Sequence, residues 1–167
     1  MNLSKDAIEK MAVNAVEDAI NTSPYLSTYI ADNDKEPSWD GFVYIYNATD
    51  KRKDQLTGRI PVQVKGTKKI DIRNNIVRYR MDTSDINNYL HDGGVLLFVV
   101  EINSSSDTHT IRKTIYYNCL TPVKLMDLLG AQSKPEQKSM LISLKEFPSS
   151  SDEMATICVN CYNNCQR

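Results

Sequence analysis

The first hydrophobic pattern along the chain is helical. Apolar residues recur at spacings of three and four, and Ser4 precedes them at the position of an N-cap. The pattern predicts a helix that ends near Asn21, with a buried stripe made of Ile8, Met11, Ala12, Ala15 and Ala19. Pro24 interrupts this pattern, and we expect a short second helix from there to Ile30.

Strand patterns occupy the middle of the chain. Aromatic and β-branched residues predict a strand over residues 42–46, and RIPVQVK (residues 59–65) predicts a second strand that Gly66 ends. A charged loop joins these two strands, so we expect them to pair as an antiparallel hairpin. Alternating side chains predict a third strand over residues 76–81. The most apolar run, VLLFVVEI (residues 95–102), predicts the central strand of the sheet, covered on both faces.

Strands and helices alternate in the second half of the chain. Further strands are expected at residues 111–117 and 139–147, and a short helix is expected between the caps at 82–85 and the turn at 92–94. Thr121 and Pro122 open a helix over residues 122–130, and Ser151 caps a closing helix over 151–165. This order predicts an α/β fold in which helices flank one mixed sheet.

Composition and length are those of an ordinary globular domain. The chain has 167 residues, of which 41% are hydrophobic and 25% charged, so one domain over residues 1–167 is expected. No apolar run reaches the roughly 18 residues of a membrane span, and the first residues do not form a signal peptide. These features predict a cytoplasmic protein without a membrane partner.

The four cysteines are expected to be structural. Cys119 stands alone in the sequence, whereas Cys158, Cys161 and Cys165 share one face of the closing helix, where cysteine behaves as a small apolar residue. A zinc site built on these three would need a fourth ligand, and both histidines lie far away in sequence. We therefore predict that these thiols belong to the core.

Charge is distributed unevenly along the chain. The formal net charge is −1, but residues 51–80 carry ten basic and two acidic side chains, a local charge of +8. Such a block attracts a polyanion. It is equally typical of a solvated hairpin, and charge alone leaves both interpretations open.

Three residues have the types and positions of a metal-dependent hydrolytic centre. Asp40 comes directly before the first strand, and Gln63 and Lys65 lie two residues apart, on one face of the second. Oxygen ligands such as a carboxylate and an amide hold Mg²⁺, and a lysine can orient the attacking water. The competing interpretation is a plain Asp-Gly turn and a surface lysine. Trp39 is expected to form a wall of the core rather than to stack on a base.

The motifs PSWDG, GRIPVQVKGT, YLHDGGVLLFVVEI and TIYYNCL resemble the DUF4365 family of bacterial proteins, and the resemblance extends over roughly residues 4–148. That family is assigned to the PD-(D/E)XK superfamily of restriction-endonuclease-like nucleases. The resemblance implies that Asp40 and Gln63 bind a metal with the main-chain carbonyl of Val64, and that Lys65 is the catalytic lysine. Gln63 replaces the usual second acid, as in Mrr-like nucleases.

The resemblance also implies a metal-binding glutamate on the first helix. Glu9 lies at the edge of the predicted stripe, whereas Glu17 lies opposite its centre and should face water, so Glu9 is favoured. The expected function is a Mg²⁺- or Mn²⁺-dependent DNA endonuclease of a bacterial antiphage defence or restriction system. The expected DNA-binding residues are Lys51, Arg52, Lys53, Thr67, Lys68 and Lys69.

Two alternatives remain open at this point. One is a catalytically silent module that binds nucleic acid or oligomerises, since the glutamine removes one negative charge from the centre. The other is a nuclease that acts on RNA. Beyond nucleic acid, the expected partners are further copies of the chain and other domains or subunits of a defence system.

Overall fold

The sheet is built around β6 (Val95–Ser104), the strand that the most apolar run predicts. The computed structural model describes residues 2–31 and 37–165. Alternate side chains of β6 enter two separate cores: Leu96, Phe98, Val100 and Ile102 on one face, and Val95, Leu97 and Val99 on the other. The prediction of a central strand covered on both faces is confirmed.

Within the described residues, eight strands form one mixed sheet in the order β1-β2-β3-β6-β7-β8-β5-β4. β3 and β6 are parallel, and the other neighbours are antiparallel. The remaining strands are β1 (Leu26–Ile30), β2 (Gly41–Tyr46), β3 (Leu56–Thr67), β4 (Asp71–Arg73), β5 (Ile76–Asp82), β7 (Ile111–Leu120) and β8 (Ser139–Glu146). β7 and β8 share two residue pairs, so the junction between the two halves of the sheet is narrow.

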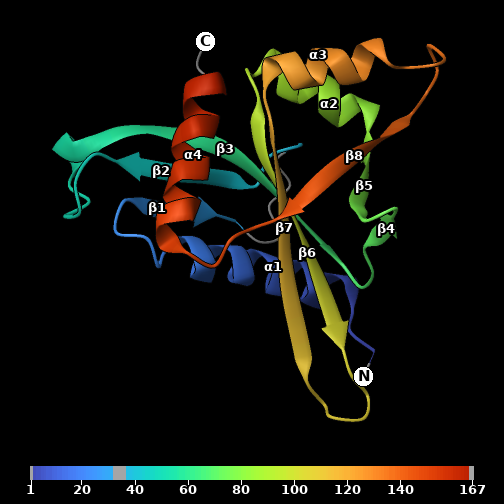
Figure 1. Cartoon of the computed structure of the whole chain (residues 1–167), viewed down its shortest axis with the longest axis horizontal. Coiled ribbons are helices and arrows are strands. Elements are labelled where there is room, and N and C mark those ends of the chain that lie inside the picture. The colour runs from blue at the N-terminus through green and yellow to red at the C-terminus, as the bar shows by residue number, and fades with distance from the viewer. Residues whose placement is uncertain (1, 32–36, 166–167) are drawn as a thin grey trace.

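Helices cover both faces of this sheet (Figure 1). α1 (Lys5–Ile20) and α4 (Ser151–Cys165) pack on one face, while α2 (Thr83–His91) and α3 (Pro122–Gly130) pack on the other. A short 3₁₀ helix, η1 (Lys53–Gln55), lies in the loop between β2 and β3. The predicted α/β architecture, a mixed sheet flanked by helices, is what the chain adopts.

The N-cap of α1 is as expected, because Ser4 Oγ accepts a hydrogen bond from the Ala7 N–H at 3.1 Å. Its buried face is rotated from the predicted one and consists of Ile8, Ala12, Val13, Val16 and Ile20. Val13, Val16 and Ile20, rather than Ala15 and Ala19, turn toward the sheet because their larger side chains remove more apolar surface from water. Met11, Ala15 and Ala19 are only partly buried.

Gly66 does not end β3, which continues to Thr67. A Cβ atom at this position would lie 2.8 Å from Ile8 Cγ2 and 2.8 Å from the Ile8 carbonyl oxygen. The glycine therefore lets α1 approach the strand backbone closely, which is a role that a strand glycine often has. The sequence interpretation mistook a packing glycine for a terminator.

The short helix expected from Pro24 to Ile30 is wrong. Residues Leu26–Ile30 form β1, which pairs antiparallel with β2 from Leu26 opposite Ile45 to Ile30 opposite Gly41. The aromatic and β-branched content of LSTYI suits a strand, and Pro24 lies in the preceding turn. The closing helix is also capped one residue earlier than expected, because Ser150 Oγ accepts the Glu153 N–H.

Candidate functional site

The candidate site lies where β2 begins beside β3. The last pair of these strands joins Gly41 to Val62, and the Asp40 N–H donates to the Val62 carbonyl at 3.0 Å. Beyond that pair, a side-chain hydrogen bond replaces the backbone pairing, because Asp40 Oδ2 accepts the Val64 N–H at 2.7 Å. The antiparallel hairpin expected from the sequence thus brings Asp40 against the segment that holds Gln63 and Lys65.

The alternation of β3 separates its side chains into two groups. Val62 and Val64 belong to the core under α1 and α4. Gln63 projects from the opposite face, where it is buried with 4% of its surface exposed, and Lys65 projects from that face as a half-buried residue. In a strand, the N–H and C=O of one residue point to the same side. The Val64 carbonyl therefore points to the side on which its N–H meets Asp40.

Tyr89 of α2 is a residue of this site that sequence reasoning missed. Its side chain is fully buried, and its hydroxyl donates to the Ser38 carbonyl at 2.6 Å. Gln63 Oε1 lies 3.3 Å from the same hydroxyl. The single proton serves the shorter bond, so the longer contact only weakly engages the amide oxygen. The available signal was a tyrosine on the apolar face of a short helix, because a buried tyrosine needs a polar partner.

The segment before Asp40 is held by α2 through Ser38. Besides the bond to Tyr89, the Ser38 hydroxyl donates to Asp85 Oδ1 at 2.6 Å and accepts from Asn88 Nδ2 at 2.9 Å. Ser38 has a positive φ of 71°, a conformation that costs a non-glycine residue free energy and needs such support. Three side chains of α2 therefore determine where the chain enters β2, and with it the position of Asp40.

Burial raises the pKa of Tyr89 far above its ordinary value, and the Asp85 and Asp40 carboxylates add to the shift. The phenol consequently stays protonated and acts as a permanent donor beside the site. Trp39 packs edge-on against the Tyr89 ring with centroids 5.9 Å apart. It lies partly buried at the border of the core between the sheet and helices α2 and α3. This agrees with the expectation that Trp39 forms a wall of the core.

The two helix glutamates lie differently from the prediction. With the observed buried face, Glu9, Val13 and Glu17 fall in one row at spacings of four, and both glutamates are half-buried. The expectation that Glu17 faces water is therefore wrong. Glu9 remains the nearer of the two to the end of β3, since its neighbour Ile8 packs on Gly66.

The face of the sheet separates Glu9 from the other candidate residues. α1 covers the face of β3 opposite to Gln63 and Lys65. Among the described residues, no hydrogen bond or ion pair joins Glu9 to either of them or to Asp40. A metal-binding role for Glu9 stays a prediction. It requires the Glu9 carboxylate to extend past the end of β3 to the face of the sheet that carries Gln63 and Lys65.

The expected DNA-binding residues fall into two groups at opposite ends of β3. Lys51, Arg52 and Lys53 lie in the β2–β3 turn, at the left of Figure 1, whereas Thr67 is the last residue of β3 and Lys68 and Lys69 follow it. β3 has 12 residues, which at about 3.3 Å per residue separates the groups by roughly 36 Å. Only the second group adjoins the candidate site. Arg52, moreover, forms an ion pair with Asp54 at 2.8 Å.

The donor set at the site fits a hard cation. Asp40 offers a carboxylate, Gln63 an amide oxygen and Val64 a main-chain carbonyl, which are oxygen ligands of the kind that Mg²⁺ and Mn²⁺ accept. Asp40 is the single formal charge of this set. Two surface hollows lie elsewhere: one of about 1080 Å³ between α3, α4 and β8, and one of about 790 Å³ beside Lys68 and Lys69.

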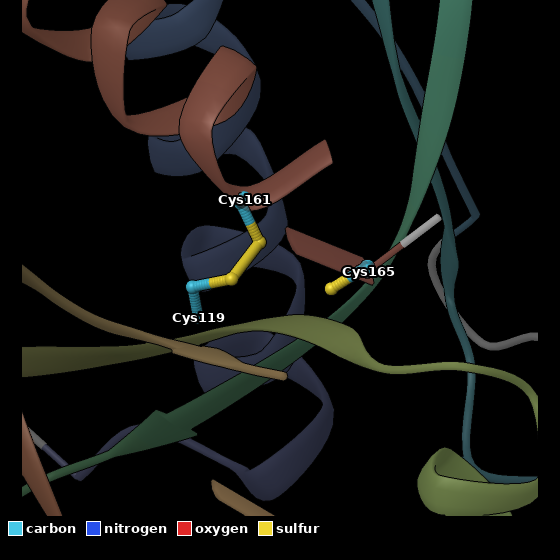
Figure 2. Close-up of side chains that lie close together, drawn as sticks. All are labelled: Cys119, Cys161 and Cys165. Atoms are coloured by element: carbon cyan, nitrogen blue, oxygen red, sulfur yellow. A yellow bond between two sulfur atoms is a disulfide. The ribbon is translucent and has the colours of Figure 1, made fainter. Parts of the chain in front are cut away.

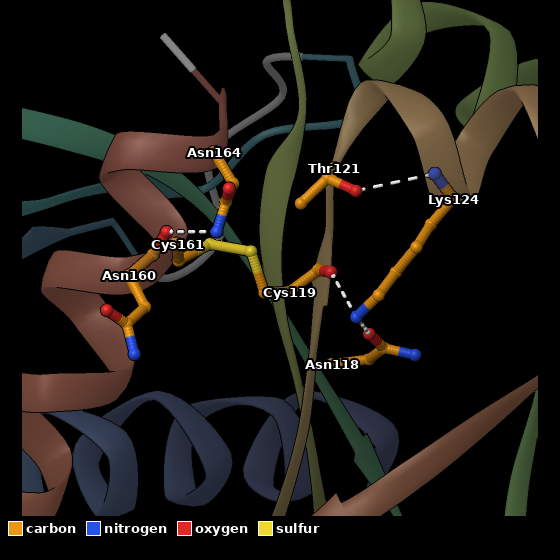
Figure 3. The surroundings of a disulfide bond; sticks show 7 residues. All are labelled: Asn118, Cys119, Thr121, Lys124, Asn160, Cys161 and Asn164. Carbon is orange, nitrogen blue, oxygen red and sulfur yellow. Dashed lines mark hydrogen bonds between the residues drawn. A yellow bond between two sulfur atoms is a disulfide. The ribbon is translucent and has the colours of Figure 1, made fainter. Parts of the chain in front are cut away.

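The cysteines form a cluster that the sequence did not predict. Cys119 of β7 and Cys161 of α4 are joined by a disulfide across 42 residues, so Cys161 lies in the core as expected but is not a free thiol (Figures 2 and 3). Cys158 and Cys165 are buried free thiols, as expected of core residues. The partner of Cys119 follows from the packing of α4 over β7, which helical spacing does not reveal.

Comparisons of the chain with protein-family models, with curated proteins and with solved structures find no match. Within the described residues, no helix combines the length and apolar character needed to cross a membrane.

Proposed function

We propose that the chain is a Mg²⁺-dependent phosphodiesterase that cleaves DNA, with its centre at Asp40, Gln63 and Lys65. The observation that carries the proposal is the 2.7 Å bond from the Val64 N–H to Asp40 Oδ2. It brings the only carboxylate of the set to the segment whose next polar side chains, Gln63 and Lys65, share one face. The resemblance of PSWDG and PVQVKG to the DUF4365 family and the PD-(D/E)XK superfamily supports the same centre.

Asp40, the Gln63 amide oxygen and the Val64 carbonyl would hold the metal ion. Mg²⁺ supplies polarisation of a phosphate oxygen and a bound water of lowered pKa. The chain's own contribution is to orient these oxygens: α2 fixes the entry of β2 through Ser38, and the strand pairing fixes Gln63 and Val64. Because Gln63 is neutral, the set carries one negative charge less than a pair of carboxylates would.

Lys65 is the proposed catalytic lysine. It projects from the same face as Gln63, two residues further along β3. An ammonium group there would orient the attacking water and stabilise negative charge on the phosphate. Thr67, Lys68 and Lys69 follow directly and would contact the neighbouring phosphates of the backbone.

The basic residues of the β2–β3 turn have a different place in this proposal. Gln63 lies seven residues along β3 from Leu56, roughly 23 Å at about 3.3 Å per residue, so the site shares a duplex with Lys51, Arg52 and Lys53 only if the DNA runs along β3. We therefore expect Lys68→Ala and Lys69→Ala to weaken DNA binding and its dependence on salt more than Lys51→Ala. Fluorescence anisotropy of a labelled duplex at several salt concentrations measures both quantities.

The test of the proposed centre is cleavage of supercoiled plasmid, linear duplex DNA and single-stranded RNA with Mg²⁺ or Mn²⁺. We expect wild type to cleave DNA and Lys65→Ala to bind the duplex but lose cleavage by at least 100-fold, on the order of the loss when a preorganised charge is removed. Lys113→Ala, an exposed lysine of β7, is the matched control and should cleave like wild type. Equal cleavage by Lys65→Ala would contradict the assignment.

A second candidate function is a silent nucleic-acid-binding module with the same fold. The neutral Gln63 in place of an acid favours it, because it weakens any cation site. If the chain binds duplex DNA but cleaves no substrate under any of these conditions, it is the silent binding module. Cleavage of RNA alone would change the substrate class.

The resemblance also supports a place in a bacterial defence or restriction system, with further copies or subunits as partners.

A further inference from the structure

The sulfur atoms of Cys119, Cys161 and Cys165 lie within 4.8 Å of one another. They come from two elements, β7 and the last turns of α4, and Figure 2 shows the Cys165 sulfur pointing toward the disulfide. A structural disulfide uses two sulfur atoms and has no need of a third. The third thiol is therefore the feature that calls for an explanation.

The spacing of these sulfur atoms suits a metal ion. In a tetrahedral site with Zn–S bonds of about 2.3 Å, neighbouring sulfur atoms are about 3.8 Å apart. The Cys165 sulfur lies no more than 4.8 Å from either partner, which exceeds that spacing by at most about 1 Å. Once the Cys119–Cys161 bond is broken, the two sulfur atoms need to separate by less than about 2 Å to reach that spacing.

The cluster is accessible from the larger hollow. Cys119 and Cys161 both line this space of about 1080 Å³, together with Asn160, Asn164 and Lys124. An ion can therefore approach from solvent, and the fourth coordination position can be filled by water from the hollow. Cys158, on the same helix, is buried in the core and does not belong to the group of three.

A positive charge is fixed beside the cluster. Lys124 Nζ donates to the Cys119 carbonyl at 3.0 Å and to Asn118 Oδ1 at 3.1 Å, as Figure 3 shows. Burial raises the pKa of the Cys165 thiol, and the Lys124 ammonium opposes that shift. Three thiolates around a divalent ion carry a net charge of −1, which this ammonium offsets.

We propose that reduction of the Cys119–Cys161 disulfide creates a three-thiolate site for a soft divalent cation of the Zn²⁺ type, completed by Cys165. A dithiol reductant supplies the two electrons and two protons that convert the disulfide to two thiols, and is itself oxidised to a disulfide. Metal binding then replaces three thiol protons, which pass to solvent. The disulfide and the metal are thus mutually exclusive states of one site, independent of the Asp40 centre.

The test uses the full chain, reduced with a phosphine and titrated without oxygen with Cd²⁺, a thiophilic stand-in for Zn²⁺. We expect one Cd²⁺ per reduced chain, with a thiolate-to-cadmium charge-transfer band, and no such band for the oxidised chain. Cys165→Ser should weaken binding by more than the roughly 10–100-fold that loss of a residue orienting a metal ligand costs. Cys158→Ser is the matched control and should bind like wild type.

Cys119→Ser provides a second loss of a ligand at a partly exposed position, in case Cys165→Ser does not fold by circular dichroism. Saturable binding that depends on Cys119, Cys161 and Cys165 but not on Cys158 would establish the site. Failure of the reduced wild type to bind one Cd²⁺ would overturn it. Equal weakening by Cys158→Ser and Cys165→Ser would overturn it as well, because it would mean that any thiol of the chain binds the ion.

Discussion

Replacing Tyr89 with phenylalanine tests whether α2 holds the candidate site through a single hydroxyl. The ring and its contact with Trp39 are preserved, so the change removes only the hydroxyl, which donates to the Ser38 carbonyl at 2.6 Å and lies 3.3 Å from Gln63 Oε1. A buried hydrogen bond contributes about 0.5–1.5 kcal/mol net, and leaving its partner unsatisfied costs about 1–3 kcal/mol. We expect the free energy of unfolding to fall by about 1–3 kcal/mol, because the Ser38 carbonyl loses its donor beside a buried phenyl ring.

Urea denaturation measures this loss, with an unchanged slope showing that the unfolded state is comparable. Tyr29→Phe is the matched control, since Tyr29 is 68% exposed, and its effect should stay within about 0.5 kcal/mol. Because Ser38 and Gln63 flank Asp40, Tyr89→Phe should also reduce DNA cleavage while leaving duplex binding nearly intact. If Tyr89→Phe and Tyr29→Phe were equally stable, the reasoning about the hydroxyl would be refuted.

Three further predictions concern β3 and the same tyrosine. Gly66→Ala should lose about 1–3 kcal/mol in urea denaturation because its Cβ meets Ile8, while Gly130→Ala, with open space around it, should not be destabilised; equal stabilities would contradict the close approach of α1. Gln63→Glu should tighten Mn²⁺ binding measured by electron paramagnetic resonance, since it adds a carboxylate to the site; unchanged affinity would count against Gln63 as a ligand. The raised pKa of Tyr89 contributes stability that is complete below about pH 10 and is lost as the pH rises further; the stability of wild type should therefore fall more steeply above that pH than that of Tyr89→Phe, and parallel curves would contradict the shift.

Much of the sheet follows from local pattern. The first six positions of β6, residues 95–100, are all apolar because both faces of the strand are covered there, and the alternation in β3 correctly divides Val62 and Val64 from Gln63 and Lys65. The antiparallel pairing of β2 and β3 follows from two adjacent strand patterns. These features are encoded within short segments, and so a single sequence is enough to predict them.

Features that depend on contacts between distant segments were not predictable in this way. β1 exists because Leu26–Ile30 pairs with β2, and Gly66 lies inside a strand because α1 packs on it. Tyr89 reaches the site only through the position of α2 against Ser38, 51 residues earlier. The disulfide likewise depends on α4 crossing β7. In each case tertiary packing overrides the local signal.

The most direct test of the central claim is the rate at which the chain nicks supercoiled plasmid as Mg²⁺ is varied, for wild type beside Asp40→Asn. Asparagine keeps the size of the side chain and an oxygen that can accept the Val64 N–H, so the change removes the charge of the metal set while preserving the strand junction. The account predicts a rate that saturates with Mg²⁺ for wild type and is nearly abolished by Asp40→Asn. A rate that is independent of Mg²⁺, or that Asp40→Asn retains, would contradict it.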